Sequence, residues 1–200
     1  KERGFFRLGT FKKIALEEDK AKIINFYKGN GFANVQLKEV KVIPSKKKRK
    51  LTIVIVIDEG KRFYLGERKI TGNLLFPEGE LKKRFFLKTG SFYIESRVDA
   101  ESNSLRNYYT DRGYLLAKIE IIRRPKPDTN IIDITYRIEP GEIISIEEVK
   151  IKGNNITRDN VIRRELKVKP GEVFCGKKLR KSIVHLSDLG YFEDIGITTE

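Results

Sequence analysis

The pattern of apolar and polar positions is clearest in the middle of the chain, where it changes from a helical period to a strand period. Val98, Ser102, Leu105 and Tyr109 recur at spacings of four, three and four residues, which places them on one face of a helix. Gly113 follows and can adopt the left-handed conformation that commonly ends a helix. We therefore predict a helix that ends shortly before Gly113.

Two alternating segments follow this helix. In residues 117–121 and again in 132–138, apolar residues alternate with polar ones, as expected of strands buried on one face. A short strand through residues 63–70 and a first helix within residues 77–86, which begins with proline, precede them. The predicted order is β-α-α-β-β. Two helices covering one face of a three-stranded mixed sheet would give an α+β fold.

Glycines and prolines show that this order is repeated along the chain. Gly31, Gly113 and Gly190, each followed by an aromatic residue, recur at nearly equal spacing. Four further pairs share a single spacing: Gly60 and Gly141, Gly72 and Gly153, Gly90 and Gly171, and Pro44 and Pro125. Such self-similarity predicts tandem units of about 80 residues, each large enough to have its own core.

We predict three units, called here the first, second and third repeats. Residues 1–59 form a unit that lacks the first strand, 60–140 a complete unit, and 141–200 a unit that lacks the last strand. Only the short junctions DEG and EPG separate them, so free linkers are excluded. The expected interdomain hinge residues are Gly60, Pro140 and Gly141.

The composition narrows the class of protein. The 42 Lys and Arg exceed the 28 Asp and Glu and give a net charge of +14, which would attract phosphates, anionic lipid headgroups or acidic proteins. No run of 18 apolar residues exists to form a transmembrane helix. The single Cys175 cannot form an intrachain disulfide. The chain does not begin with Met, so we expect a piece of a longer protein.

Motifs with catalytic or ligand-binding chemistry are weak. GEVFCGKK has the glycine and lysine spacing of a phosphate-binding loop but lacks the following Ser or Thr. His185 has no second ligand at metal-binding spacing and no nucleophilic partner. KKKRK, residues 46–50, falls at the expected tip of a hairpin, where a solvated turn or a contact with phosphates are the two interpretations. We expect no enzyme activity, no metal and no cofactor.

Exposed sheet edges are the more informative feature, because an open sheet leaves backbone N–H and C=O groups free to pair with another strand. Val35 and Leu37 are in one phase of alternation, whereas Val40 and Val42 are in the other. An extra residue near Lys38 and Glu39 would reconcile them, which predicts a β-bulge that either blunts the edge or directs it toward a partner.

The following strand, LTIVIVID, is apolar in both phases of the alternation. Val54 and Val56 would face away from the helices. They are expected either to form a patch for a partner or to be covered by the neighbouring unit.

Several motifs together resemble one known family. The strand-ending Gly-Asn, the glycine break between the helices and the final Y-x-x-x-G-Y/F are similar to the POTRA domain, and the tandem resembles the periplasmic part of BamA-type outer-membrane assembly factors. The most specific stretch is IKGNNITRDNVIRRELKVKPGEVF with LSDLGYFEDI, which resembles the unit directly before the membrane β-barrel in that family. The resemblance covers essentially the whole chain.

The resemblance implies a location on the periplasmic side of the bacterial outer membrane. It implies unfolded outer-membrane β-barrel proteins and accessory assembly lipoproteins as partners, bound by strand addition at the second strand of a unit. The residues at these edges are Val35, Gln36, Leu37, Lys38, Glu39, Lys118, Ile119, Glu120 and Ile121. The positive charge adds an anionic membrane surface as a further expected contact, and no nucleic acid is expected.

Two alternatives stay open at this point. The same domain occurs in two-partner secretion transporters and in translocation-and-assembly factors. From a different class, a basic α+β module could bind RNA, which would need aromatic residues on a sheet surface or a Gly-x-x-Gly clamp. Tyr108, Tyr109 and Tyr114 are instead expected at a helix end and in the core.

Overall fold

The structure is a computed structural model that describes residues 13–44, 50–192 and 194–198. The chain forms two compact units. The first contains residues 1–67, 88–98 and 124–133, and the second contains 68–87, 99–123 and 134–200. This division passes through the strands of the second repeat.

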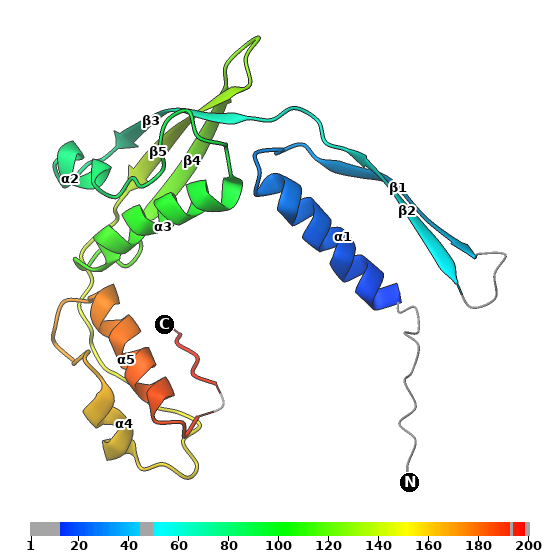
Figure 1. The fold of residues 1–200 in the computed structure, drawn as a ribbon. Helices are drawn as coiled ribbons and strands as arrows, with labels where there is room; N and C mark the ends of the chain where they lie inside the picture. The colour runs from blue at the N-terminus through cyan, green and yellow to red at the C-terminus, as the bar shows by residue number, and fades with distance from the viewer. Residues whose placement is uncertain (1–12, 45–49, 193, 199–200) are drawn as a thin grey trace, which may run out of the picture. The chain divides into compact units, whose positions relative to one another are not determined.

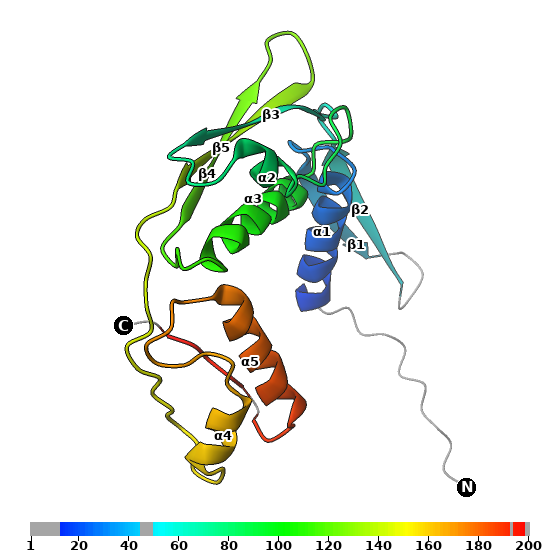
Figure 2. The ribbon, with the colours of Figure 1, turned by 90° about the vertical axis from the view of Figure 1, so that its left-hand side faces the viewer.

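The second repeat has the predicted β-α-α-β-β order, with the elements β3 (Tyr64–Gly72), α2 (Glu78–Lys82), α3 (Glu95–Thr110), β4 (Lys118–Pro125) and β5 (Ile131–Glu139). The three strands form one sheet in the order β3-β5-β4, and both ribbon views show α2 and α3 over the same face of it (Figures 1 and 2). The predicted α+β class is therefore confirmed. The last strand in sequence is the central strand of the sheet.

The helical face predicted for α3 forms the centre of the core. Val98, Leu105 and Tyr109 are fully buried, and Ser102 is nearly so. The alternating positions of β5 are buried as well: Ile132, Ile134, Tyr136 and Ile138, whereas Arg137 between them is exposed. The pattern of apolar positions thus located both the helix and the strand that it covers.

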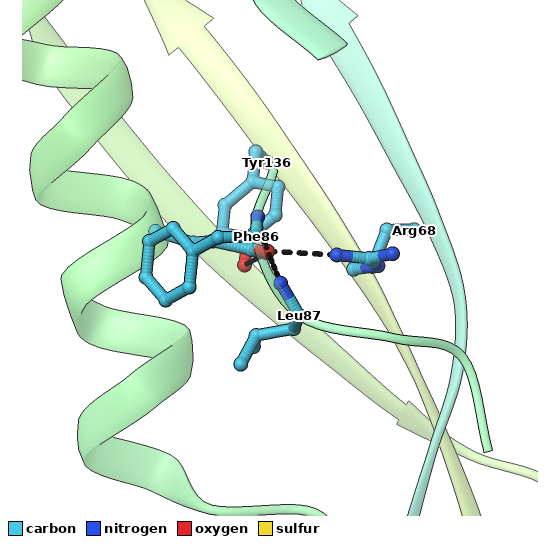
Figure 3. A network of polar contacts seen from close by, with 5 residues as sticks. Arg68, Phe86, Leu87 and Tyr136 are labelled. Atoms are coloured by element: carbon cyan, nitrogen blue, oxygen red, sulfur yellow. Dashed lines mark hydrogen bonds and ion pairs between the residues drawn. The ribbon is translucent and has the colours of Figure 1, made fainter. Parts of the chain in front are cut away.

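A buried carboxylate connects three elements of this repeat. Glu101 on α3 is fully buried, and its Oε1 accepts hydrogen bonds from Arg68 Nη1 at 2.7 Å and from the backbone N–H groups of Phe86 and Leu87 at 2.8 and 2.7 Å (Figure 3). Its Oε2 accepts from the hydroxyl of Tyr136 on β5 at 2.8 Å. Because this carboxylate takes the two backbone donors, the chain leaves the helical path, and α2 is shorter than the predicted segment 77–86.

The first repeat contains α1 (Lys13–Lys28) and a hairpin of β1 (Gln36–Pro44) and β2 (Leu51–Asp58). The register shifts between Leu37 and Glu39, which confirms the predicted bulge. Among the described side chains of β2, Val54 and Val56 are 38% and 43% exposed. Most of the KKKRK segment lies outside the described residues.

The third repeat contains α4 (Asp159–Glu165) and α5 (Gly176–Asp188), which pack against each other. This unit was predicted to lack only its last strand, but in its described part no strand ladder forms within residues 143–154 or near Ile195 and Ile197. One isolated bridge, Ser145 to Val173, is present.

Candidate strand-accepting edges and the joints between repeats

The first candidate edge is β4, which is an outer strand of its sheet. Lys118 and Glu120 are exposed, whereas Ile119 is only 8% exposed and packs toward the helices. Ile121 is half-buried. In the described residues, β5 is the sole strand hydrogen-bonded to β4, so the outer side of Lys118–Ile121 presents backbone groups without a strand partner.

The second candidate edge is β1, which pairs with β2 alone in the described part of the chain. Val35 lies just before the strand and is buried. Gln36 and Leu37 pair with Asp58 and Ile57, and the pairing resumes at Glu39. Lys38 is the unpaired residue of the bulge, and its Nζ lies 3.2 Å from a carboxylate oxygen of Asp58.

The two joints between repeats are built from matching backbone contacts. Phe63 N donates to Gly31 O at 2.8 Å, and Ile144 N donates to Gly113 O at 3.0 Å. The two donors are at equivalent positions of successive repeats, and the two acceptors are as well. The repeated sequence therefore forms the same backbone hydrogen bond twice. The first joint lies within the first compact unit and the second within the second unit.

The segment after each joint also pairs in the same way. Leu65 N donates to Ser91 O, and Ile146 N donates to Glu172 O, both at 2.8 Å. The isolated bridges Tyr64 to Phe92 and Ser145 to Val173 are equivalent as well. The segment that begins a repeat is thus hydrogen-bonded to the glycine turn of the preceding repeat. It is also hydrogen-bonded to the turn before the second helix of its own repeat, α3 or α5.

The glycines at the joints are required for two reasons. Gly31 and Gly113 have φ of +91° and +100°, a conformation that favours glycine. A Cβ on Gly31 would lie 3.1 Å from Cβ of Phe92, and a Cβ on Gly113 would lie 2.7 Å from Cγ1 of Val173. These glycines were predicted to end helices, but the packing of the next repeat against them was not predicted. Their fixed spacing was the available signal.

The side chains at the two joints differ. At the first joint the guanidinium of Arg62 lies between two rings, 4.6 Å from the centroid of Phe32 and 4.4 Å from that of Phe92. At the second joint Arg180 Nη2 forms an ion pair with Asp111 Oδ1 at 2.7 Å. The first joint therefore uses stacking on aromatic faces, and the second uses an ion pair beside aliphatic packing.

The predicted hinge residues lie next to these contacts. Gly60 and Gly141 have φ of +65° and +72°, and Pro140 is buried. A Cβ added to either glycine would meet ordinary van der Waals neighbours, Asn34 in one case and Leu116 in the other. The left-handed backbone explains why glycine occupies both positions. Rotation about them stays a prediction.

Other candidate chemistry is limited. Among the described residues no group of three His, Cys, Asp or Glu side chains is placed to hold a metal ion. His185 Nδ1 lies 3.9 Å from Glu165 Oε2. In the segment that resembles a phosphate loop, Lys178 Nζ bonds to Glu172 at 2.6 Å, and this hydrogen bond raises the pKa of Lys178 and lowers that of Glu172. No helix in the described part of the chain has the length and apolarity needed to cross a membrane.

Two of the three tyrosines considered for base stacking are buried, and Tyr114 is half-buried. Tyr109 is fully buried and Tyr108 is 5% exposed, as expected for core and helix-end positions. The ring of Phe76 contacts the rings of Tyr108, Tyr109 and Tyr114. These four rings form one aromatic cluster in the second unit.

Comparison with known families agrees with the repeats. Residues 2–60, 63–141 and 144–200 each match the POTRA model, described as a surface antigen variable number repeat. The chain belongs to the POTRA family. The resemblance predicted from the glycine and aromatic motifs is confirmed.

Known relatives of this POTRA chain are outer-membrane assembly factors. It is 32% identical over 190 residues to outer membrane protein assembly factor BamA of Neisseria meningitidis, covering 94% of this chain and 24% of that protein. It is 29% identical over 202 residues to BamA of Nitratidesulfovibrio vulgaris, covering 97% and 25%. The chain thus spans about a quarter of the length of these relatives.

A solved structure has the same fold. The crystal structure of BamA POTRA3-5 from Haemophilus influenzae matches with a TM-score of 0.78 at 22% identity, covering 94% of this chain and 74% of that one. The match includes all three repeats at once, so the tandem POTRA architecture is confirmed.

Proposed function

We propose that this chain is the periplasmic POTRA region of an assembly factor for outer-membrane β-barrel proteins and acts there by binding, without catalysing a reaction. The similarity of nearly the whole chain to BamA relatives carries this proposal. Unfolded outer-membrane proteins and accessory lipoproteins are its proposed partners. Three separate POTRA domains, at 1–59, 60–140 and 141–200, are the proposed units, and the family matches to 2–60, 63–141 and 144–200 support these boundaries.

The proposed binding mode is strand addition at the free edge of β4. Main-chain hydrogen bonds supply affinity without demanding a particular sequence. A client with many transmembrane strands shares only an alternation of apolar and polar residues, so a backbone-directed site suits it. The outer position of β4 and the exposed side chains of Lys118 and Glu120 support this mode. The bulged edge of β1 from Val35 to Glu39 is the second proposed site.

A labelled peptide of about ten residues with strict apolar and polar alternation tests the β4 edge by fluorescence anisotropy. Two variants separate the two sides of the strand: Ile119→Pro and Glu120→Pro. Successive N–H groups of a strand point to opposite sides, so one variant removes a bond to β5 and the other removes an outward donor. The variant that removes only an outward donor is expected to unfold at the same urea midpoint as the native protein but to lose peptide binding.

The matched controls are a peptide of the same composition without alternation and a single-stranded RNA of similar length. Equal binding of the alternating peptide by the native protein and by both proline variants would exclude β4 as the site. Tight RNA binding that disappears with salt, together with no peptide binding, would overturn the assembly function and favour the RNA-binding class.

A further inference from the structure

The third repeat has a basic cavity on the surface of α5, the orange helix of Figure 1. Its volume is about 600 Å³. Seven side chains line it: Lys167, Lys177, Lys178, Arg180, Lys181, Val184 and His185. No carboxylate is among the lining residues, although the chain has 28 acidic residues to distribute.

The charges in the cavity are only partly balanced. Lys178 pairs with Glu172, and Arg180 pairs with Asp111. Within the described residues Lys167, Lys177 and Lys181 make no ion pair, and all three are exposed. Three like charges around one hollow repel one another, and a bound anion would remove that repulsion.

The arrangement on the helix combines charge with an apolar surface. Lys177, Lys181 and Val184 are spaced by four and three residues, so they lie along one face of α5. Val184 is 55% exposed among the lysines, and the aliphatic stems of the lysines enlarge the apolar surface beside it. A basic helix face with an exposed apolar residue is the composition that binds at the interface of an anionic bilayer.

We propose that this cavity binds the phosphate groups of anionic phospholipids and holds the third repeat against a membrane surface. The inference rests on the proposed function, which places the chain beside the outer membrane, and it assigns that contact to particular residues. A bilayer is favoured over nucleic acid because the lining residues contain no aromatic side chain on which a base could stack. Each lysine near an anionic surface contributes roughly fivefold in partitioning.

Sedimentation with vesicles of equal parts phosphatidylglycerol and phosphatidylcholine tests the proposal. The triple variant Lys167→Gln, Lys177→Gln, Lys181→Gln is expected to lower the partition coefficient about a hundredfold. The matched control Lys61→Gln, Lys83→Gln, Lys88→Gln removes the same charge from exposed lysines elsewhere and should lower it less than tenfold. Vesicles of pure phosphatidylcholine should bind neither the native protein nor the two triple variants.

Three outcomes would overturn the lipid site. One is an equal loss of vesicle binding in the two triple variants, since net charge alone would then explain it. Another is displacement from the vesicles by inorganic phosphate at the same ionic strength as a sodium chloride control, since the cavity would then recognise free phosphate. The last is RNA binding stronger than vesicle binding.

The alternating peptide distinguishes this proposal from the proposed function, because Lys167, Lys177 and Lys181 lie outside β1 and β4. A triple variant that binds peptide normally but not vesicles supports both proposals. If the native protein binds vesicles but not the peptide, only the proposed strand addition is overturned.

Discussion

At the first joint Arg62 lies between the rings of Phe32 and Phe92, whereas at the second joint the position equivalent to Arg62 is Ile143. Both joints nevertheless make the same backbone hydrogen bond to a glycine turn, at 2.8 and 3.0 Å. The two joints thus have the same backbone hydrogen bond but different side chains around it. This explains why the glycines recur at a fixed spacing while the aromatic and charged residues at the joints do not.

The interiors of the second and third repeats show the same kind of exchange. Glu101 accepts hydrogen bonds from the N–H groups of Phe86 and Leu87, and Ser182, which occupies the equivalent position of the third repeat, accepts from the N–H of Lys167 at 2.8 Å. Both side chains are almost completely buried. A carboxylate and a hydroxyl therefore hold the same turn, but only the carboxylate also binds an arginine and a tyrosine.

Removing the Glu101 carboxylate should give the largest effect, and the equivalent Ser182 substitution is the comparison. Glu101→Ala leaves the half-buried Arg68, the hydroxyl of Tyr136 and two backbone donors without their acceptor, so we expect a loss of about 3–5 kcal/mol in the free energy of unfolding. Ser182→Ala leaves the N–H of Lys167 unpaired and should cost about 1–2 kcal/mol. Urea unfolding measures both.

Glu101→Gln is the matched control for this comparison. It keeps one acceptor oxygen but removes the charge that faces Arg68, so its cost should fall between those of the two alanine variants. A Glu101→Ala variant no less stable than Ser182→Ala would show that the two ties are equivalent and that the additional partners of the carboxylate contribute little.

The sequence contained enough information to predict the element order, the bulge and the buried face of α3. These follow from periodicity, which depends on residues near one another in the chain. Glu101 was missed although it stands three residues after Val98 and four before Leu105, on the same buried face, because a charged residue is usually assigned to the solvent side. The absence of a strand ladder in the described part of the third repeat was also missed, because alternation indicates a strand but not its pairing partner.

The contacts at the joints could not be predicted because they connect residues that are distant in sequence. Arg62 and Phe92 are separated by a strand and a helix, and Asp111 and Arg180 belong to different repeats. No periodic pattern links such pairs. The structure has Lys118–Ile121 on an outer strand, and the role of this segment as an edge for a partner strand stays a prediction.

Substitution of the joint glycines should have the next largest effect. Gly113→Ala combines an unfavourable φ of +100° with a Cβ 2.7 Å from Val173, so we expect a loss of about 2–3 kcal/mol. Gly190 has φ of +67° with nothing within 4 Å of an added Cβ, and Gly190→Ala should cost about 1 kcal/mol. Equal losses in urea unfolding would mean that backbone strain alone matters and that packing of the next repeat adds nothing.

Salt should separate the two joints. Arg62→Ala is expected to cost about 1–2 kcal/mol at any salt concentration, because stacking on two ring faces depends weakly on screening. Arg180→Ala should cost less than about 1 kcal/mol at low salt and nothing measurable at high salt, because its ion pair with Asp111 is partly exposed. Urea midpoints at low and high sodium chloride check this. A salt-dependent loss in Arg62→Ala would show that its charge acts through distant carboxylates.

The smallest expected effect concerns Tyr27 and Tyr109, which are equivalent residues of the first and second repeats. Burial raises the pKa of Tyr109, and a hydrogen bond to Glu59 raises that of Tyr27. A raised pKa in the folded state means that the neutral phenol is favoured, so its contribution to stability is complete below the ordinary value of 10.0 and is lost as the pH rises through the folded value.

We therefore expect stability to decline above the ordinary pKa of tyrosine and Tyr109→Phe to reduce that decline. Tyr27→Phe should reduce it less, because Tyr27 is more exposed. Urea unfolding at neutral and alkaline pH measures this, with tyrosinate absorbance as an independent signal. An equal decline in Tyr109→Phe and the native protein would exclude the buried phenol as the cause.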